Sequence, residues 1–140
     1  MLISTRGRYG LRIMIELAEL RETNAYVPLR DLAERQNISE KYLEAILKHL
    51  VSAGYIEGRR GKGGGYRLTI PTDEISVYSI LVATEQNLAP VTCLDIEGGC
   101  DRREDCKTFP LWEALDRNIS EFLQGVYLKD LLEGSSLRLP

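Results

Sequence analysis

The first part of the chain repeats apolar and polar residues with a helical period. Over residues 8–20, apolar side chains recur at spacings of three and four, which places them on one face of a helix. A stripe of this kind is typical of a helix that packs against a core. We therefore predict a helix here whose inward face consists of Leu11, Met14, Ile15 and Ala18.

Two further helical patterns follow, over residues 29–36 and from residue 40 to about 53. Asn37 readily adopts the left-handed conformation that ends a helix, and Ser39 is a favourable N-cap for the next one. Two short helices joined by such a turn are typical of a helix-turn-helix motif, whose second helix enters the DNA major groove. The residues expected inside are Leu29, Leu32 and Ala33 in the first helix, and Tyr42, Leu43, Ile46, Leu47, Leu50 and Val51 in the second.

Residues 55–70 predict two short strands around a glycine-rich, basic tip. The tip carries Arg59, Arg60 and Lys62, and no acidic residue occurs from there to Arg67. This charge pattern favours phosphate binding, and glycines let arginine side chains approach a narrow DNA groove. The pattern does not fit a nucleotide-binding P-loop, because the lysine precedes the glycines and a strand follows. We predict the β-hairpin wing of a winged helix.

Beyond the boundary at Pro71, residues 75–84 predict a short buried helix. Residues 111–125 predict a longer amphipathic helix with Pro110 in its first turn, and residues 127–133 a last short helix. The apolar stripe of the long helix is aromatic and extensive for so small a chain. A second copy would bury it well, and packing within one chain is the alternative. The predicted dimerisation residues are Trp112, Leu115, Ile119 and Phe122.

Composition adds a division of charge. The 140 residues are 44% hydrophobic and 28% charged, as in an ordinary globular protein. Residues 1–70 carry 12 basic and 8 acidic side chains, a net +4, whereas residues 71–140 carry 6 and 13, a net −7. A basic half predicts a polyanionic partner, here double-stranded DNA. With no apolar run near the roughly 18 residues of a membrane span and no signal segment, we expect a cytoplasmic protein without membrane contact.

Glu44 is the informative residue on the helix expected to meet DNA. A carboxylate there repels phosphate unless it accepts a hydrogen bond from a cytosine amino group. The alternative is that Glu44 is solvated or pairs with Lys48 one turn later. The predicted DNA-binding residues are Ser39, Lys41, Tyr42, Glu44, Lys48, Arg59, Arg60 and Lys62.

All the cysteines of the chain, Cys93, Cys100 and Cys106, lie on one polar, glycine-containing loop. In a reducing cytosol, clustered thiols indicate a metal site, an iron–sulfur site or a redox switch more readily than a structural disulfide. A zinc site lacks the closely spaced cysteine pair that such sites use. The chain shows no nucleophile–base pair and no cofactor loop, so we do not expect an enzyme.

Four segments match one known pattern. They are Arg6-Gly-Arg-Tyr-Gly10, residues 27–39 with Tyr42-Leu-Glu44, residues 60–66 (Arg-Gly-Lys-Gly-Gly-Gly-Tyr), and three cysteines shortly before Leu111-Trp112. Together they resemble the Rrf-two family of bacterial transcription regulators, closest to its IscR-like iron–sulfur cluster regulators. The resemblance covers nearly the whole chain. It implies a homodimeric winged-helix factor on a palindromic promoter site, with Glu44 reading bases and Arg60 probing the minor groove.

The same resemblance implies an iron–sulfur cluster on Cys93, Cys100 and Cys106. A 2Fe–2S cluster is expected, with 4Fe–4S, as in NsrR-like siblings, as the second choice. Phe109 stands where IscR-like proteins have a histidine ligand, and Arg8 where NsrR-like proteins have a carboxylate. A cluster-free thiol-redox or cysteine-metabolism regulator, as in CymR-like siblings, is the alternative. The fourth ligand is open among Glu85, Asp95, Glu97, Asp101, Glu104, Asp105 and a residue of a second subunit.

The predicted architecture is mainly α-helical. A winged helix-turn-helix domain with a two-stranded wing spans residues 1–72, and a connecting helix spans residues 73–90. The cysteine loop, residues 91–110, is the expected sensor. A long C-terminal dimerisation helix and a tail occupy residues 111–140. Cluster binding is expected to order the loop and thereby to shift the DNA-binding domains, by as much as the cluster favours one state.

Overall fold

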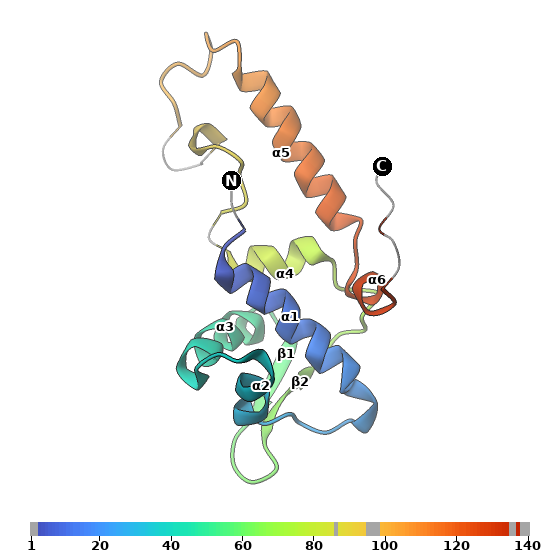
Figure 1. Cartoon of the computed structure of the whole chain (residues 1–140). Helices are drawn as coiled ribbons and strands as arrows, with labels where there is room; N and C mark the ends of the chain where they lie inside the picture. The colour runs from blue at the N-terminus through green and yellow to red at the C-terminus, as the bar shows by residue number, and fades with distance from the viewer. Residues whose placement is uncertain (1–2, 86, 95–98, 135–136, 138–140) are drawn as a thin grey trace.

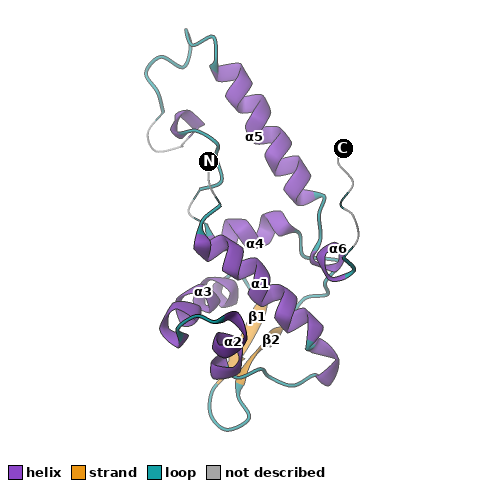
Figure 2. Ribbon diagram, in the orientation of Figure 1, coloured by secondary structure: helices purple, strands orange, loops and turns teal. Residues whose placement is uncertain are grey.

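The computed structural model of the chain describes residues 3–85, 87–94, 99–134 and 137. It is mainly helical and carries a two-stranded antiparallel sheet, which confirms the predicted fold class. Figures 1 and 2 show the elements in the same orientation. In chain order they are α1 (Thr5–Glu19), η1 (Arg21–Thr23), α2 (Leu29–Gln36), α3 (Glu40–Ser52), β1 (Ile56–Arg59), β2 (Gly65–Leu68), α4 (Val77–Thr84), η2 (Thr92–Leu94), α5 (Phe109–Gln124) and α6 (Leu128–Leu132).

Helix α1 is the central element, with α2 and α3 packed on one side and α4 and α6 on the other (Figure 1). The predicted inward face is right for Met14 and Ala18. Leu11 and Ile15 are only half-buried, at the edges of this face. The difference arises because α1 contacts neighbours on two sides, and Leu11 also packs against a second apolar cluster near α4. The buried stripe is Ile13, Met14, Leu17 and Ala18.

Asn37 and Ser39 set the geometry of the helix-turn-helix. Asn37 ends α2 with a φ of +54°, and Ser39 precedes α3 as its N-cap. The Ser39 Oγ accepts a hydrogen bond from the backbone N–H of Tyr42 at 3.1 Å. Both local signals therefore act as the sequence predicts. The inward face of α3 is Leu43, Ile46, Leu47 and Leu50, which are fully buried.

The wing is fastened to the segment that precedes α2. The Val27 N–H donates to the Tyr66 carbonyl at 2.8 Å, and the Tyr66 N–H donates to the Val27 carbonyl at 2.9 Å. Gly65 permits this approach, because its φ is +141° and a Cβ there would overlap the Val27 backbone. The β1–β2 hairpin is therefore held at a fixed place beside α3.

The second half forms a smaller cluster around Val77, Leu81 and Val126. From it, α5 extends away from the body of the molecule (Figures 1 and 2). The helix begins at Phe109, two residues before the predicted start, with Pro110 in its first turn as expected. Phe109 is the buried residue of this helix. Within the part of the chain that the structure describes, no helix has the length and apolar character needed to cross a membrane.

Candidate nucleic-acid interface and cysteine loop

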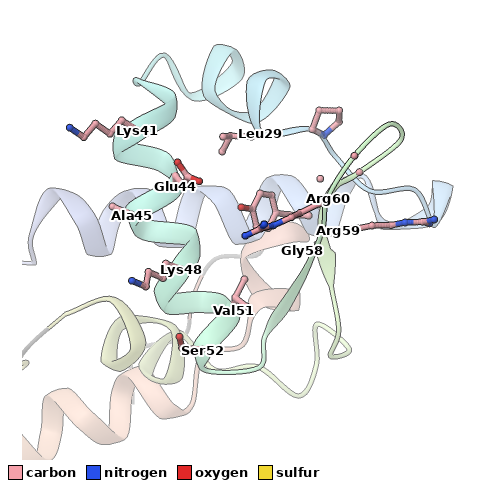
Figure 3. A pocket seen from close by; sticks show the side chains of 15 residues that line it. Leu29, Lys41, Glu44, Ala45, Lys48, Val51, Ser52, Gly58, Arg59 and Arg60 are labelled. Carbon is pink, nitrogen blue, oxygen red and sulfur yellow. The ribbon is translucent and has the colours of Figure 1, made fainter.

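A groove of about 820 Å³ separates α3 from the wing (Figure 3). The exposed face of α3 forms one wall, strand β1 and the wing tip form the other, and Pro28 and Leu29 close one end. The groove exists because α3 buries its opposite face in the core while the Val27–Tyr66 backbone pair holds the wing at a distance. From the predicted DNA-binding set it brings together Lys41, Glu44, Lys48, Arg59 and Arg60.

The cations of the groove differ in direction. Figure 3 shows Arg60 pointing from the wing into the groove towards α3, whereas Arg59 points away from it. The Arg59 guanidinium instead lies 5.8 Å from the centre of the Tyr26 ring. Lys41 and Lys48 project from α3 and are exposed. Among the ion pairs of the described residues, none involves these lysines or Arg60, so their charges are available to an anion.

Glu44 is the acidic residue of the groove and lies on the α3 wall. The alternative in which it pairs with Lys48 is not seen, since no ion pair in the described part of the chain joins the two. Burial raises the pKa of Tyr66, the nearby negative charge of Glu44 raises it further, and Arg60 opposes the shift. The Tyr66 hydroxyl therefore lies within the electrostatic influence of both Glu44 and Arg60.

Three predicted contact residues lie outside the groove walls. Ser39 caps α3, and the Tyr42 ring packs edge-on against Tyr9, with centroids 6.1 Å apart and planes at 89°. Lys62 is exposed at the wing tip. Ser39 and Tyr42 thus have structural roles, and DNA contact by them stays a prediction.

Arg67 is not a free cation of the wing. Its Nε lies 2.5 Å from Glu57 Oε1, and its guanidinium lies 4.4 Å from the centre of the Tyr26 ring. The hydrogen bond from Arg67 lowers the pKa of Glu57 below its ordinary value. This pair joins β2 to β1 and supports the hairpin. The basic charge offered by the wing therefore comes from Arg59, Arg60 and Lys62.

Val51 lines the groove, and the prediction that it faces the core was wrong. Its spacing predicted an inward position, but the side chain is 40% exposed and lines the groove. It lies near the end of α3, where the core side is already filled by Leu47 and Leu50. Helical spacing places Val51 at the boundary of the inward face, and it does not reveal which side of that boundary is covered.

The cysteine loop presents three thiols in different settings. Cys93 lies in η2 and is half-buried, Cys100 is exposed, and Cys106 is half-buried. The Cys106 Sγ lies 3.2 Å from the Thr108 Oγ1. Hydrogen bonding by the Thr108 side chain, and then by its backbone, lowers the pKa of the Cys106 thiol, which favours thiolate. The candidate ligands Asp95 and Glu97 fall outside the described residues.

The donor set suits a thiophilic metal centre in kind, because three thiols on one loop are soft ligands. The described residues do not gather three or more His, Cys, Asp or Glu side chains around one point. Phe109 is buried, and the Arg103 guanidinium lies 4.5 Å from its ring centre, so an aromatic contact replaces the ligand at that position. Glu85 accepts hydrogen bonds from Ser4. The loop therefore offers three ligands of the right chemistry and leaves the fourth unassigned.

Comparison with known proteins finds relatives that match nearly the whole chain. The Rrf2 family model, described as an iron-dependent transcriptional regulator, matches residues 3–134. The HTH-type transcriptional regulator IscR of Aliivibrio salmonicida is 39% identical over 132 residues, or 94% of this chain and 77% of that protein. The structure of CymR, the global cysteine regulator of B. subtilis, matches with a TM-score of 0.75 at 34% identity, over 97% of this chain and 99% of that one.

A second solved structure, that of T. potens IscR, has a TM-score of 0.73 and 31% identity, over 97% of this chain and 89% of that one. The family match covers nearly the whole chain, and the resemblance seen in the sequence is confirmed. The curated relatives are named as transcriptional regulators, not as enzymes. The chain belongs to the Rrf2 family and is an IscR-like transcriptional regulator.

Proposed function

We propose that this regulator binds palindromic double-stranded DNA as a homodimer through the groove between α3 and the wing, and that the cysteine loop controls the binding. The observation that carries the proposal is the groove itself. Lys41 and Lys48 on the α3 wall are exposed, and Arg60 points into the groove from the wing. None of the three has a carboxylate partner among the ion pairs of the described residues. Such cations neutralise phosphates and release their counterions.

The two walls suit different parts of a duplex. The DNA major groove admits an α-helix, so the exposed face of α3 can enter it, where Glu44 can accept a hydrogen bond from a cytosine amino group. Ala45 and Val51 add apolar surface, which suits the methyl group of thymine. Arg60 comes from a glycine-rich hairpin, the kind of element that inserts an arginine into a minor groove.

A second copy of the chain is the proposed cover for α5. Leu111 is 59% exposed and Leu115 is 40% exposed, while Trp112, Ile119 and Phe122 are half-buried. Apolar side chains of this size seldom face solvent in a row. Two copies related by a two-fold axis would bury the same stripe from both sides and would place two winged domains on the two halves of a palindrome.

For the cysteine loop, we propose an iron–sulfur cluster held by Cys93, Cys100 and Cys106, with 2Fe–2S favoured over 4Fe–4S. The support is the set of three thiols and the similarity to proteins named IscR. A cluster usually has four protein ligands, so a fourth must come from the loop, from Glu85 or from the second copy. When bound, the cluster would supply a redox- and iron-sensitive state of the loop.

The DNA proposal is tested by footprinting the purified protein on genomic fragments. We expect a protected palindrome, and we expect the logarithm of the affinity to fall linearly with the logarithm of salt concentration. Binding that shows no preference among fragments, or no salt dependence, would contradict it.

The loop proposal is tested separately by anaerobic reconstitution with iron and sulfide. Visible charge-transfer bands and bound iron are the expected result. A specific observation favours one alternative, because CymR structures match this chain over nearly all of their length and one of them is an oxidized form. Three free thiols, no bands and a DNA affinity that changes with thiol oxidation would favour that alternative.

A further inference from the structure

The start of α1 and the start of the cysteine-loop segment meet at one polar contact. The Glu85 Oε1 accepts hydrogen bonds from the Ser4 backbone N–H at 2.8 Å and from the Ser4 Oγ at 2.7 Å. Glu85 ends α4 and precedes the segment 87–94, which carries Cys93. The two partners are 81 residues apart in sequence. We call this contact the Ser4–Glu85 latch.

The latch also completes the N-terminus of α1. Ser4 is the N-cap, and its Oγ accepts from the Gly7 N–H at 3.2 Å. The first turn of α1 has no acidic residue of its own, so Glu85 supplies the negative charge that a helix N-terminus favours. Gly7 lies directly against the carboxylate, and a Cβ at that position would overlap it. The sequence therefore leaves room for Glu85 at this point.

An apolar contact lies beside the latch. Ile3, just before α1, and Leu88, in the segment leading to Cys93, both pack against the cluster of Val77, Leu81 and Val126. Near the other end of α5, Phe122 and Leu123 pack against the same cluster. The beginning of the DNA-binding half, the base of the cysteine loop and the end of α5 thus share one small core.

We propose that the Ser4–Glu85 latch transmits a change in the cysteine loop to the DNA-binding half. A change that displaces residues 87–94 also displaces Glu85 and Leu88. It thereby breaks the hydrogen bonds between Glu85 and Ser4 and disturbs the apolar cluster that Leu88 shares with Ile3. Release of Ser4 uncaps α1, the helix against which α2 and α3 pack. In this proposal the latch has two states, with Ser4 bonded to Glu85 or released from it, as such coupling requires. The regulatory meaning of this coupling rests on the proposed function.

Hydrogen exchange of the whole protein tests the latch without DNA. The compared samples are the metal-free, reduced protein and the same protein with its thiols alkylated by iodoacetamide. We expect alkylation to speed exchange of the amides in residues 4–10 severalfold and to leave residues 56–68 of the wing unchanged. In Glu85→Ala, residues 4–10 should already exchange fast, and alkylation should add nothing further.

Glu74→Ala is the matched control, because Glu74 is exposed and precedes α4 at its other end. It should behave as the parent does. Replacement of the three cysteines by serine repeats the comparison if alkylation lowers the melting temperature. Unchanged exchange at residues 4–10 after loop modification, or an equal acceleration in the parent and in Glu85→Ala, would overturn the proposal.

DNA affinity separates this proposal from the proposed function. If the parent binds a palindrome, alkylation should change its Kd, and the fold-change should shrink towards one in Glu85→Ala. If the parent binds no DNA, but alkylation still speeds amide exchange at residues 4–10 in the parent and not in Glu85→Ala, the proposed function is refuted and the latch is retained. A loop-dependent Kd that is the same in Glu85→Ala as in the parent would refute the latch and leave the function.

Discussion

Arg59 and Arg60 are neighbours in sequence, yet their side chains leave the wing in opposite directions (Figure 3). Successive residues of a strand point to opposite faces, and Arg59 is the last residue of β1. One arginine therefore stacks on Tyr26, and the other enters the groove beside Tyr66. A sequence with two adjacent arginines does not say which of them faces DNA, because that depends on the position of the hairpin relative to α3.

Arg60→Ala should weaken DNA binding and flatten its salt dependence. Each phosphate contact contributes about −0.9 to the slope of log affinity against log salt concentration. Loss of one contact should therefore reduce the magnitude of the slope by about 0.9. Fluorescence anisotropy over a salt series measures it. Arg30→Ala is the matched control, since Arg30 is exposed and paired with Glu34 on α2. An Arg60 variant that binds like the parent at every salt concentration would rule out its DNA contact.

Glu44→Gln should change base preference more than affinity. The carboxylate repels phosphates and accepts hydrogen bonds only, whereas an amide also donates. We expect binding to unrelated DNA to strengthen and discrimination at one base pair to fall by about 1–3 kcal/mol. Competition between the site and single-base variants provides the measurement. Unaltered discrimination at every position would show that Glu44 is solvated in the complex.

At the scale of elements, the wing depends on the backbone pair between Val27 and Tyr66. Gly65→Ala should destabilise the fold by about 1–3 kcal/mol, because alanine must adopt an unfavourable φ. The new Cβ also meets the Val27 backbone. Gly63→Ala is the control, since Gly63 has φ +75° and nothing within 4 Å of the added Cβ. Urea unfolding followed by circular dichroism measures both. If both variants lose the same free energy of unfolding, the contact between the added Cβ and Val27 contributes nothing to the loss.

Elements with strong local signals could be predicted from the sequence. Asn37 and Ser39 fix the helix-turn-helix because their own backbone and side-chain preferences end one helix and begin the next. Helical spacing alone could not choose between Ile13 and Leu11 as core residues. That choice depends on which side of α1 meets α3 and which meets α4, and therefore on contacts between distant segments.

At the scale of the whole molecule, the least predictable features join segments far apart in sequence. Arg67 ends the basic run of the wing, but it is paired with Glu57 on the neighbouring strand. Glu85 was one of several acids near the cysteines, and its contact with Ser4 follows only from the packing of α4 on α1. The three cysteines were evident from the sequence. Their mutual arrangement was not, because no periodic pattern orders the loop between them.

Dimerisation through α5 is the prediction on which the two-fold arrangement depends. Leu115→Asp should raise the dimer dissociation constant at least tenfold, because burying a leucine contributes about 1.5–3 kcal/mol and a symmetric interface buries it twice. Sedimentation equilibrium over a range of protein concentrations measures the constant. Arg117→Asp also places a carboxylate on α5, but on another side of the helix, since residues two apart do not face each other. It should dimerise like the parent.

A parent protein that stays monomeric, or two variants that weaken the dimer equally, would show that the apolar stripe with Leu111 and Leu115 is not the interface. Loss of the dimer in Leu115→Asp alone should also reduce footprints from a full palindrome to weak half-site binding, because each subunit carries one groove.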